Sequence, residues 1–342
     1  MKEKKLIYHA KVLKNASIKK FINCINEAHR LSGNSKLYCF TDMVKSKIKY
    51  DAGYYDYVIF QFWNLNDKQR DTYLTRFRSK KLISQVNDES YAHYFDNKDE
   101  FNDIFKDYIG REFISLEVAT KNQVEDFFNS RNQIFCKMND LECGIGCEKI
   151  KTSNFKNFED FYKYVTDKGF GTLEDVIENH PDLEKVYSGS VNTMRMITLI
   201  DDDGNPNLIY AVQKFGVNGR VVDNYGVHGP VDINTGEFLY PAHSGDTKAE
   251  GLYSEHPNSH EPLVGFVTPM FSEAKKMILK ASLVIPQIRY VGWDVAITPN
   301  GPAIIEGNTY CAHDFWQLPG QTPNGIGIMP TIKKLVPSFK YK

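Results

Sequence analysis

The spacing of apolar residues predicts that the first third of the chain is mainly helical. Over residues 16–31 (ASIKKFINCINEAHRL), apolar side chains recur at three- and four-residue intervals, the period of an amphipathic helix. The predicted apolar stripe consists of Ile18, Phe21, Ile22 and Ile25. Gly33 and Asn34 then supply a stop signal. A second helix is predicted over residues 66–87, with Asn66 or Asp67 as its N-cap.

From about residue 110 the pattern changes to short strands, loops and two further helices. NQIFCKMND (132–140) predicts a strand that runs into a glycine-containing loop, LECGIGCEKI (141–150). Residues 157–169 predict a helix that ends at Gly169, and residues 272–285 predict another. Residues 186–200 end in a β-rich run, and strand-like runs continue at 208–216 and 220–227. The polar segment 233–262 predicts a long loop that contains His243, His256 and His260.

Composition narrows the class of protein. A chain of 342 residues with 42% hydrophobic and 25% charged residues can bury the core of one large domain or of two to three small ones. Its net charge of −1 argues against a nucleic-acid partner. No apolar run approaches the roughly 20 residues of a transmembrane segment, and lysines interrupt the N-terminus where a signal peptide would be apolar. We therefore expect a soluble, cytoplasmic protein.

The six cysteines do not indicate a disulfide framework in a chain of this length and type. Cys143 and Cys147 are spaced C-x3-C, but no second pair of cysteines or histidines follows at a zinc-like spacing. A structural zinc site is not expected.

The stretch GWDVAITPNGPAIIEGN (292–308) predicts two apolar strands around a tight turn, yet it contains Asp294, Glu306 and Asn308. A two-residue turn at 300–301 would pair position 294 with 307 and send the two carboxylates to opposite faces. A three-residue turn at 299–301 would pair 294 with 306 and gather the carboxylates and the amide on one face. We favour this second register, since it also gathers apolar side chains on the other face. These are Trp293, Val295, Ile297, Ala303 and Ile305.

Directly opposed carboxylates have Cβ atoms roughly 4.5–5.5 Å apart, and they repel unless one holds a proton or a cation lies between them. Two acids and an amide form an oxygen-only ligand set, which suits one or two Mg²⁺ ions, with Mn²⁺ as an alternative. We predict Asp294, Glu306 and Asn308 as metal ligands. The alternative interpretation is that these are polar residues at a strand edge that face water.

Mg²⁺ held by few protein carboxylates usually also binds phosphates. Lys137 ends the predicted strand IFCK, and Gly144 and Gly146 lie in the loop that follows. A strand lysine beside a flexible glycine loop can place a charge and backbone N–H groups on an anion. The alternative is a tight turn next to an exposed lysine.

In this order, these parts resemble the ATP-grasp superfamily and, within it, the sugar-transfer-associated ATP-grasp group. The resemblance runs from about Lys98 to Asn308 and is strongest at VNTMRMITLI (191–200) and at 292–308; LNDKQRDTYLTRF (65–77) is also similar. It implies an α+β fold in which two α+β subdomains grip ATP. The expected division is a helical N-terminal region (1–110), a small lid subdomain (111–177) and a large subdomain with the Mg²⁺ and ATP site (178–342).

The resemblance also implies how the nucleotide would be held. Lys98 and Lys137 would contact the ATP phosphates, and the loop 143–147 would close over them. The segment LEDVIE (173–178) would hold adenine. Its contributions would be the backbone of Asp175 and Val176 and the side chains of Glu174 and Glu178, as candidates for the adenine amino group and the ribose.

For the reaction itself, the resemblance implies that Asp294, Glu306 and Asn308 bind Mg²⁺, that Arg195 lies near the transferred phosphate and that Lys137 assists catalysis. The alternatives are structural. Lys98 lies in a charged run typical of a solvated face, and an arginine on an apolar strand commonly forms a salt bridge. Glu174 and Glu178 also have the spacing of a helix surface.

Two further sets of residues have alternative interpretations. Lys214 and Arg220 precede DNYGVHG (223–229), a stretch that departs from the pattern of the group. These two residues either contact phosphate or substrate or are surface charges. For the three histidines of the polar segment, a mobile surface loop is favoured over substrate contact.

The function that the resemblance implies is ligation of a carboxylate and an amine. ATP would phosphorylate a small-molecule or sugar-linked carboxylate to an acyl phosphate, which an amine would then attack. The name of the group suggests cell-surface polysaccharide or capsule biosynthesis as the setting. The alternatives are a phosphotransferase of the same architecture and a nucleotide- or glycan-binding module without turnover. The intact set of Asp294, Glu306 and Asn308 argues against the last of these.

Overall fold

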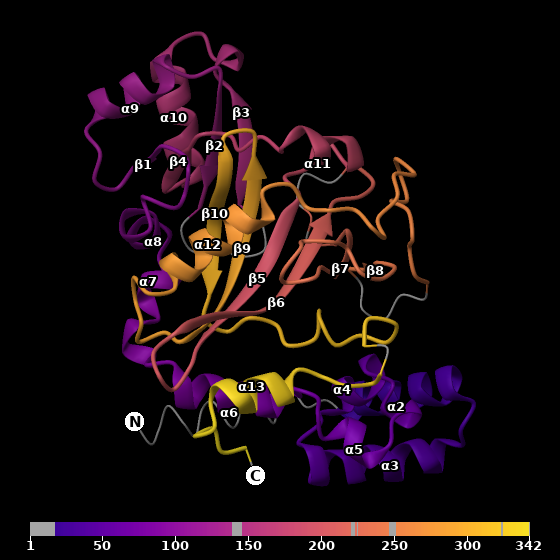
Figure 1. Cartoon of the computed structure of the whole chain (residues 1–342). Helices are drawn as coiled ribbons and strands as arrows, with labels where there is room; N and C mark the ends of the chain where they lie inside the picture. The colour runs from indigo at the N-terminus through magenta and orange to yellow at the C-terminus, as the bar shows by residue number, and fades with distance from the viewer. Residues whose placement is uncertain are drawn as a thin grey trace. The chain divides into compact units, whose positions relative to one another are not determined.

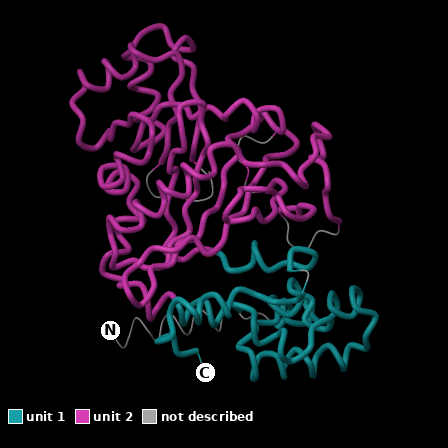
Figure 2. The backbone as a smooth tube through the Cα atoms, in the orientation of Figure 1, with its two compact units in different colours: residues 1–82, 312–342 teal, residues 83–311 magenta. Residues whose placement is uncertain are grey.

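The computed structural model describes residues 18–138, 146–219, 223, 225–245, 251–322 and 324–341. The chain divides into two compact units, residues 1–82 with 312–342, and residues 83–311 (Figure 2). Each unit has hydrophobic clusters of its own. Both sheets of the described residues belong to the second unit.

The first unit is helical, as the N-terminal pattern predicts. Its elements are α2 (Ile18–Ser32), α3 (Lys36–Tyr50), α4 (Tyr54–Ile59), η1 (Phe62–Asn64), α5 (Asp67–Arg70), α6 (Arg76–Val86), which continues past the unit boundary, and α13 (Met329–Leu335). Residues 16 and 17 of the first predicted helix lie outside the described residues. The predicted stripe is wrong in part, because Ile18 and Ile22 face solvent whereas Cys24 and Ala28 are buried.

The single helix predicted over 66–87 is two helices, α5 and α6, with a break between them. Asn66 caps α5, as expected, by accepting from the amide of Gln69. In the break, the guanidinium of Arg78 donates to the carbonyl oxygens of Asp71 and Tyr73 at 2.8 and 3.1 Å. The side chain of Gln317 bonds both backbone groups of Leu74. These side chains satisfy backbone groups that a continuous helix would have paired internally, so the break carries little penalty.

The second unit combines two sheets with short helices (Figure 1). Its helices are η2 (Glu89–Tyr91), α7 (His93–Asp96), α8 (Lys98–Ile104), α9 (Lys121–Asn129), η3 (Thr152–Asn154), α10 (Phe158–Lys168), α11 (Pro181–Val186) and α12 (Phe271–Ala281). The helix predicted to end at Gly169 is confirmed in α10, since Gly169 follows it with a left-handed φ of 74°.

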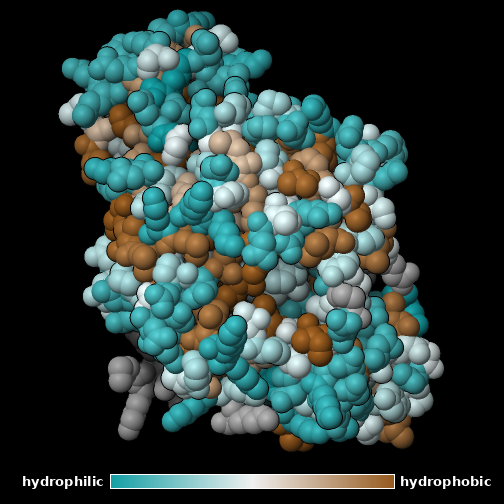
Figure 3. Space-filling model, in the orientation of Figure 1, coloured by the Kyte–Doolittle hydropathy of each residue, from teal (hydrophilic) through white to brown (hydrophobic). Residues whose placement is uncertain are grey.

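A four-stranded sheet has the order β1-β4-β2-β3. Its strands are β1 (Phe113–Ser115), β2 (Gln133–Lys137), β3 (Cys147–Lys151) and β4 (Thr172–Glu174). The apolar faces of α9 and α10 pack on it around Phe128, Phe161 and Leu173. On the face shown in Figure 3, hydrophilic residues predominate over these two helices. The glycine loop between β2 and β3 is described only from Gly146; Gly144 lies outside the described residues.

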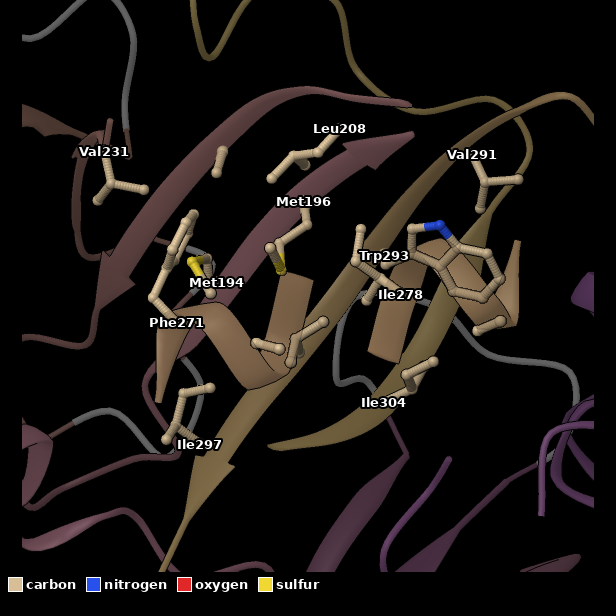
Figure 4. Packing of buried hydrophobic residues seen from close by; sticks show 14 of the residues in the cluster. Met194, Met196, Leu208, Val231, Phe271, Ile278, Val291, Trp293, Ile297 and Ile304 are labelled. Carbon is tan, nitrogen blue, oxygen red and sulfur yellow. The ribbon is translucent and has the colours of Figure 1, made fainter. Parts of the chain in front are cut away.

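A six-stranded sheet has the order β10-β9-β5-β6-β7-β8, with neighbouring strands antiparallel. Its strands are β5 (Thr193–Ile200), β6 (Pro206–Phe215), β7 (Val227–Pro230), β8 (His243–Ser244), β9 (Tyr290–Thr298) and β10 (Gly301–Asn308). Helix α12 lies across one face, and Phe271 and Ile278 pack against the sheet residues Met194 and Met196 (Figure 4). This packing leaves the other face for polar side chains.

The hairpin β9–β10 corrects the predicted turn. The loop has two residues, Pro299 and Asn300, because Gly301 pairs with Thr298. A bulge follows at Ile305, and it restores the pairing of Asp294 with Glu306. Before the bulge the register differs by one residue from the prediction.

The shifted register changes which residues of β10 share the apolar face. Ile304 pairs with Val295 and is buried in the same cluster as Trp293. Ala303 pairs with Ala296 on the opposite face, and Ile305 is the extra residue of the bulge. The predicted places of Ala303 and Ile305 were therefore wrong, because the predicted three-residue turn hid the extra residue in the loop.

The two sheets fall within the predicted lid (111–177) and large (178–342) subdomains. The compact units differ from the predicted division at both ends. The first unit ends at residue 82 rather than 110, and it includes residues 312–342. The latter difference follows from specific bonds: the amide of Met329 donates to the carbonyl oxygen of Thr72, and Gln317 pairs with Leu74. Among the described residues, no helix is long and apolar enough to cross a membrane.

Candidate active site

Two strands bring the predicted metal ligands together on one face. Asp294 on β9 is paired directly with Glu306 on β10. The amide Nδ2 of Asn308 lies 3.3 Å from Oε1 of Glu306 and 3.4 Å from the carbonyl oxygen of Gly292. Asp294 is buried, whereas Glu306 is exposed to solvent. The predicted pairing of Asp294 with Glu306 is therefore confirmed, although the turn differs.

Arg195 holds Asp294 in a two-point ion pair. The two residues face each other across β5 and β9, and Arg195 donates from Nε to Oδ1 at 2.6 Å and from Nη2 to Oδ2 at 2.8 Å. Such a planar, bidentate pair fixes both the position and the orientation of the carboxylate. Arg195 thus forms the salt bridge of the structural alternative, and it does so at the predicted metal site.

Lys214 on β6 extends this ion pair into a buried network. Its Nζ lies 3.4 Å from Oδ1 of Asp294 and 3.4 Å from Oδ1 of Asp223. Asp223 in turn accepts from the backbone N–H and the hydroxyl of Thr193 at 2.7 and 2.6 Å. Lys214 is buried, so it is not one of the surface charges considered from sequence. Arg220 lies outside the described residues.

The electrostatics of the opposed carboxylates are unequal. Burial opposes ionisation of Asp294, but the charges of Arg195 and Lys214 outweigh it and hold its pKa below the ordinary value. Although part of the Glu306 side chain reaches solvent, the protein atoms around its carboxylate desolvate it and, with the nearby charge of Asp294, raise its pKa. Asp294 is therefore a fixed anion, and Glu306 is the carboxylate that gains from a proton or a cation.

A second cluster surrounds Lys137 at the end of β2. Its Nζ lies 2.6 Å from Oε2 of Glu174 at the end of β4. Arg111 donates from Nε to the same oxygen at 2.8 Å, and Asn102 on α8 donates to Oε1 at 3.1 Å. Burial disfavours the charge of Glu174, but the attraction of Lys137 and Arg111 prevails and lowers its pKa to about 2. Desolvation lowers the pKa of Lys137, and Glu174 opposes that shift.

Arg111 connects this cluster to the hairpin. Its Nη1 donates to the carbonyl oxygen of Ile304 at 2.7 Å, immediately before the bulge that aligns Glu306 with Asp294. The same nitrogen donates to the carbonyl oxygen of Ile109 at 3.0 Å. One buried guanidinium therefore ties the partner of Lys137 to the strand that carries Glu306.

Lys98 and the base of the glycine loop lie in the same region. Lys98 opens α8, and its Nζ donates to the carbonyl oxygen of Met138 at 2.9 Å. The amide of Met138 donates to the carbonyl oxygen of Gly146 at 3.1 Å, which closes the base of the loop. Burial raises the pKa of the Cys147 thiol, and charges that act on it include Lys137, Lys98 and Glu306. Because its ammonium group is held by the carbonyl oxygen of Met138, Lys98 does not simply face solvent.

In the segment 173–178, which is predicted to hold adenine, some of the hydrogen-bonding groups already have partners within the protein. Glu174 points into the Lys137 cluster instead of offering itself to an amino group. The amide of Asp175 donates to the carbonyl oxygen of Glu112 at 3.0 Å, and its carboxylate pairs with Arg131 at 2.5 Å. Contact of its backbone with adenine would therefore use the carbonyl oxygen. Val176 is partly buried and Glu178 is exposed beyond the end of β4.

The donor set fits a hard divalent cation. Glu306 and Asn308 present oxygen ligands at an exposed position, and a cation would relieve the raised pKa of Glu306. The oxygens of Asp294 are engaged by Arg195 but keep lone pairs for a second partner. Among the described ranges, no group of three or more His, Cys, Asp or Glu residues could hold a metal ion. A metal here therefore depends on the amide of Asn308 and on ligands from a bound molecule.

The polar segment 233–262 is not uniformly a surface loop. His256 is buried, its Nε2 lies 2.8 Å from the carbonyl oxygen of Gly216, and burial lowers its pKa. His243 lies on β8 opposite His228. His260 is exposed. The loop interpretation is wrong for His256, which packs beside Tyr187.

Two residues of the site were not identified from sequence. Arg111 and Asn102 flank the Lys137–Glu174 pair, but neither lies in a motif: Arg111 follows Gly110 and lies two residues before β1, and Asn102 is in the charged run around α8. The resemblance to the group assigned Lys98, the first residue of α8, to the nucleotide site. This assignment was the one sequence signal that α8 contributes to the site.

Comparison with protein families defines the class. Residues 161–335 match the family described as sugar-transfer associated ATP-grasp. The match spans just over half of the 342 residues, and the chain belongs to this family. The resemblance drawn from the motifs and the α+β ATP-grasp fold are thus confirmed. No curated protein matches the sequence.

The chain also matches several solved structures over part of its length. ATP-grasp ligase PsnB, complexed with a minimal precursor, Mg and ADP, is 10% identical with a TM-score of 0.42, over 73% of this chain and 60% of its own. D-alanine-D-alanine ligase from Coxiella burnetii is 12% identical with a TM-score of 0.38, over 74% and 58%. N5-carboxyaminoimidazole synthetase from Staphylococcus aureus, complexed with ADP, is 10% identical with a TM-score of 0.43, over 70% and 52%.

Proposed function

We propose that the protein is an ATP-dependent ligase that joins a carboxylate to an amine and releases ADP and phosphate. The observation that carries the proposal is the pairing of Asp294 with Glu306, with Arg195 clamped on Asp294. This arrangement of two carboxylates beside a fixed cation supports the proposal of a metal site next to a phosphate. Membership of the ATP-grasp family supports ATP as the nucleotide.

The proposed reaction has two steps. In the first, an oxygen of the substrate carboxylate forms a bond to the γ-phosphorus of ATP, and the bond to the bridging oxygen breaks, which releases ADP. In the second, the nitrogen of an amine forms a bond to the acyl carbon, phosphate leaves with the electron pair of the C–O bond, and the amine loses a proton. The product is an amide. Neither step needs a nucleophilic residue of the enzyme.

The residues of the site meet the demands of phosphoryl transfer, which are positioning and neutralisation of charge. Lys137 and Lys98 would bind phosphate oxygens of ATP, for which Lys137 must exchange its contact with Glu174. Arg195 would offset the negative charge of the transferred group while it keeps Asp294 in place. Glu306 and Asn308, with Asp294, would hold one or two Mg²⁺ ions, with Mn²⁺ as an alternative. Such an ion would supply positive charge to offset the charge of the phosphate groups.

Two further segments would complete the nucleotide-binding site. Val176 and the carbonyl oxygen of Asp175 would contact adenine, with Glu178 near the ribose. The loop with Gly144 and Gly146 would close over the phosphates and exclude water, so that the acyl phosphate is not hydrolysed. The three-part division at residues 110 and 177 follows from the same proposal, since the small sheet would then be the lid.

For the substrates, we propose a sugar-linked or small carboxylic acid and an amine. An acid on a sugar, or a small acid destined for a sugar, together with an amine would be joined in the cytoplasm during biosynthesis of a surface polysaccharide such as capsule. The description of the family as sugar-transfer associated supports this setting.

The test is ADP release with pairs of acceptors. Candidate acids, uronic acids first, are screened by thermal shift with an ATP analogue and Mg²⁺, and the hits are assayed with ATP and a panel of amines. ADP formation that requires both the acid and the amine supports ligation. A stable phosphorylated product would show a phosphotransferase instead, and no turnover with any acceptor would leave a binding module.

A further inference from the structure

Helices α2 and α3 expose large apolar side chains to solvent. On α3, Leu37, Phe40, Val44 and Ile48 follow one another at three- and four-residue intervals, so they form one stripe along the helix. Leu37 is 72% exposed and Ile48 81%. The buried face of α3 is a different one and contains Cys39, Met43, Ser46 and Tyr50. The exposed stripe is therefore not the face that holds α3 in the first unit.

The exposed stripe continues onto α2. Phe21 of α2 contacts Phe40 of α3 at 6.0 Å between ring centroids, and Ile18 and Ile22 lie on α2 beside Phe21. Ile18 is 77% exposed. A shallow depression on α3 is lined by Thr41, Val44, Lys45, Ile48 and Lys49. Hydrophobic residues are visible at the lower edge of this region in Figure 3. A contiguous apolar surface of this kind marks an interaction site.

The surroundings of the stripe are strongly basic. Residues 18–50 contain seven Lys and Arg and two Asp and Glu, a net charge of +5 in a chain whose net charge is −1. One of the two acids, Asp42, is buried against Arg70. Asp51 and Asp67 pair with lysines of α3, and the surface remains at +3 when both are counted. On α3, the lysines flank the apolar stripe on both sides, at positions 36, 45, 47 and 49.

We propose that α2 and α3 form a docking surface for a membrane that contains anionic phospholipids. An apolar stripe flanked by lysines is the pattern of a helix that lies in the plane of a membrane interface. The stripe would enter the boundary between headgroups and acyl chains, and the lysines would meet the lipid phosphates. A second copy of the chain is a poorer occupant, because two such surfaces would bring like charges together. The proposal does not depend on the proposed ligase activity.

Sedimentation with lipid vesicles tests the docking surface in the full chain. We expect the protein to sediment with vesicles of phosphatidylcholine and phosphatidylglycerol at low salt, and to stay in solution with phosphatidylcholine alone. Ile48→Ser should lower the bound fraction several-fold. The matched control is Val118→Ser, which alters a side chain that is 84% exposed in the second unit and should leave binding unchanged. Equal binding by Ile48→Ser and the native protein would overturn the proposal.

The charge component has its own variant. Lys19 and Lys36 lie in the first turns of α2 and α3, where a glutamate is favourable for the helix dipole, so Lys19→Glu with Lys36→Glu should reverse charge without loss of folding. The double variant should lose binding to anionic vesicles and keep its unfolding temperature. Lys276→Glu on α12 is the control for a change of net charge, and it should bind normally.

The same measurements would reveal two other occupants of the α2–α3 surface, a second copy of the chain or residues 1–17. A concentration-dependent dimer in the absence of lipid, lost in Ile48→Ser, would assign the surface to a second copy and overturn the membrane proposal. Vesicle binding that appears only after removal of residues 1–17 would show that this segment covers the stripe in the full chain, and would overturn it as well.

Discussion

Asp294 and Glu306 face each other directly across β9 and β10. In a regular hairpin this pairing would require a three-residue turn, but the turn has only two residues. The bulge at Ile305 supplies the missing residue. Without it, Asp294 would lie opposite Ile305 and Glu306 would turn to the other face. The bulge is therefore what places the two carboxylates opposite each other, and Arg111 holds the strand beside it through the carbonyl oxygen of Ile304.

Glu306→Gln should abolish Mg²⁺-dependent turnover, because the amide keeps the shape of the side chain but removes the charge that a cation requires. We expect a loss of at least about 10²-fold in kcat, the effect of removing one stabilising group of an active site. The measurement is ADP release as a function of Mg²⁺ concentration. Glu273→Gln, on the exposed side of α12, is the control. Unchanged activity of Glu306→Gln would refute the metal assignment.

Arg195→Lys should lower kcat and destabilise the protein, because a lysine cannot reproduce the bidentate contact with Asp294. Breaking a buried ion pair of this kind costs about 3–5 kcal/mol when one charge is left alone, and less when a lysine keeps part of the attraction. Thermal unfolding and kcat are measured together. The control is Arg289→Lys, because Arg289 pairs with Asp202 near the surface. This substitution should change kcat and the unfolding temperature little. Native kcat in Arg195→Lys would remove Arg195 from the reaction.

Glu174→Gln should change how stability depends on pH. The native carboxyl titrates at about 2 rather than near 4.5, so its stabilising charge is fully present above pH 4.5 and is lost as the pH falls through that window. At pH 7 we expect the variant to be less stable by about 3 kcal/mol. The difference in unfolding temperature between the native protein and the variant should shrink as the pH is lowered from 5 towards about 2. A difference that stays constant over this range would show that the charge of Glu174 is not what stabilises the cluster.

The role of Lys137 requires a paired design, because Lys137→Met alone would leave Glu174 buried with one partner fewer. Lys137→Met in the Glu174→Gln background removes both charges. Compared with Glu174→Gln alone, it should weaken binding of an ATP analogue about 10- to 100-fold, since a hydrogen bond to a charged group contributes about 1.5–3 kcal/mol. Isothermal titration calorimetry provides the affinities. Equal affinity in the two proteins would place Lys137 outside the nucleotide site.

The hydrophobic pattern was sufficient for the parts of the fold that depend on local signals. The helix α10 and its end at Gly169, the strands β5 and β6, and the helix α12 all follow from period and caps. The break between α5 and α6 does not, because it is stabilised by Arg78 and by Gln317, a residue far along the chain. A pattern within one segment contains no information on such a partner.

The candidate site was also predictable only where the pattern within one segment determines the structure. The opposition of Asp294 and Glu306 was predictable because two carboxylates and an amide on one face of a hairpin restrict the register. The bulge was not, since an extra residue in the strand and one in the turn give the same pairing. The partners of Glu174 were also missed, because Arg111 and Asn102 approach from segments about 60–70 residues away and belong to no motif.

The most direct test of the account is binding of a divalent cation together with a nucleotide at the Asp294–Glu306 pair. Mn²⁺ is titrated into the native protein and into Glu306→Gln, with and without a non-hydrolysable ATP analogue, and bound ion is followed by electron paramagnetic resonance. The native protein should bind Mn²⁺ tightly when the analogue is present, and Glu306→Gln should lose this nucleotide-dependent binding. Equal Mn²⁺ binding by both proteins in the presence of the analogue would contradict a metal site at this pair.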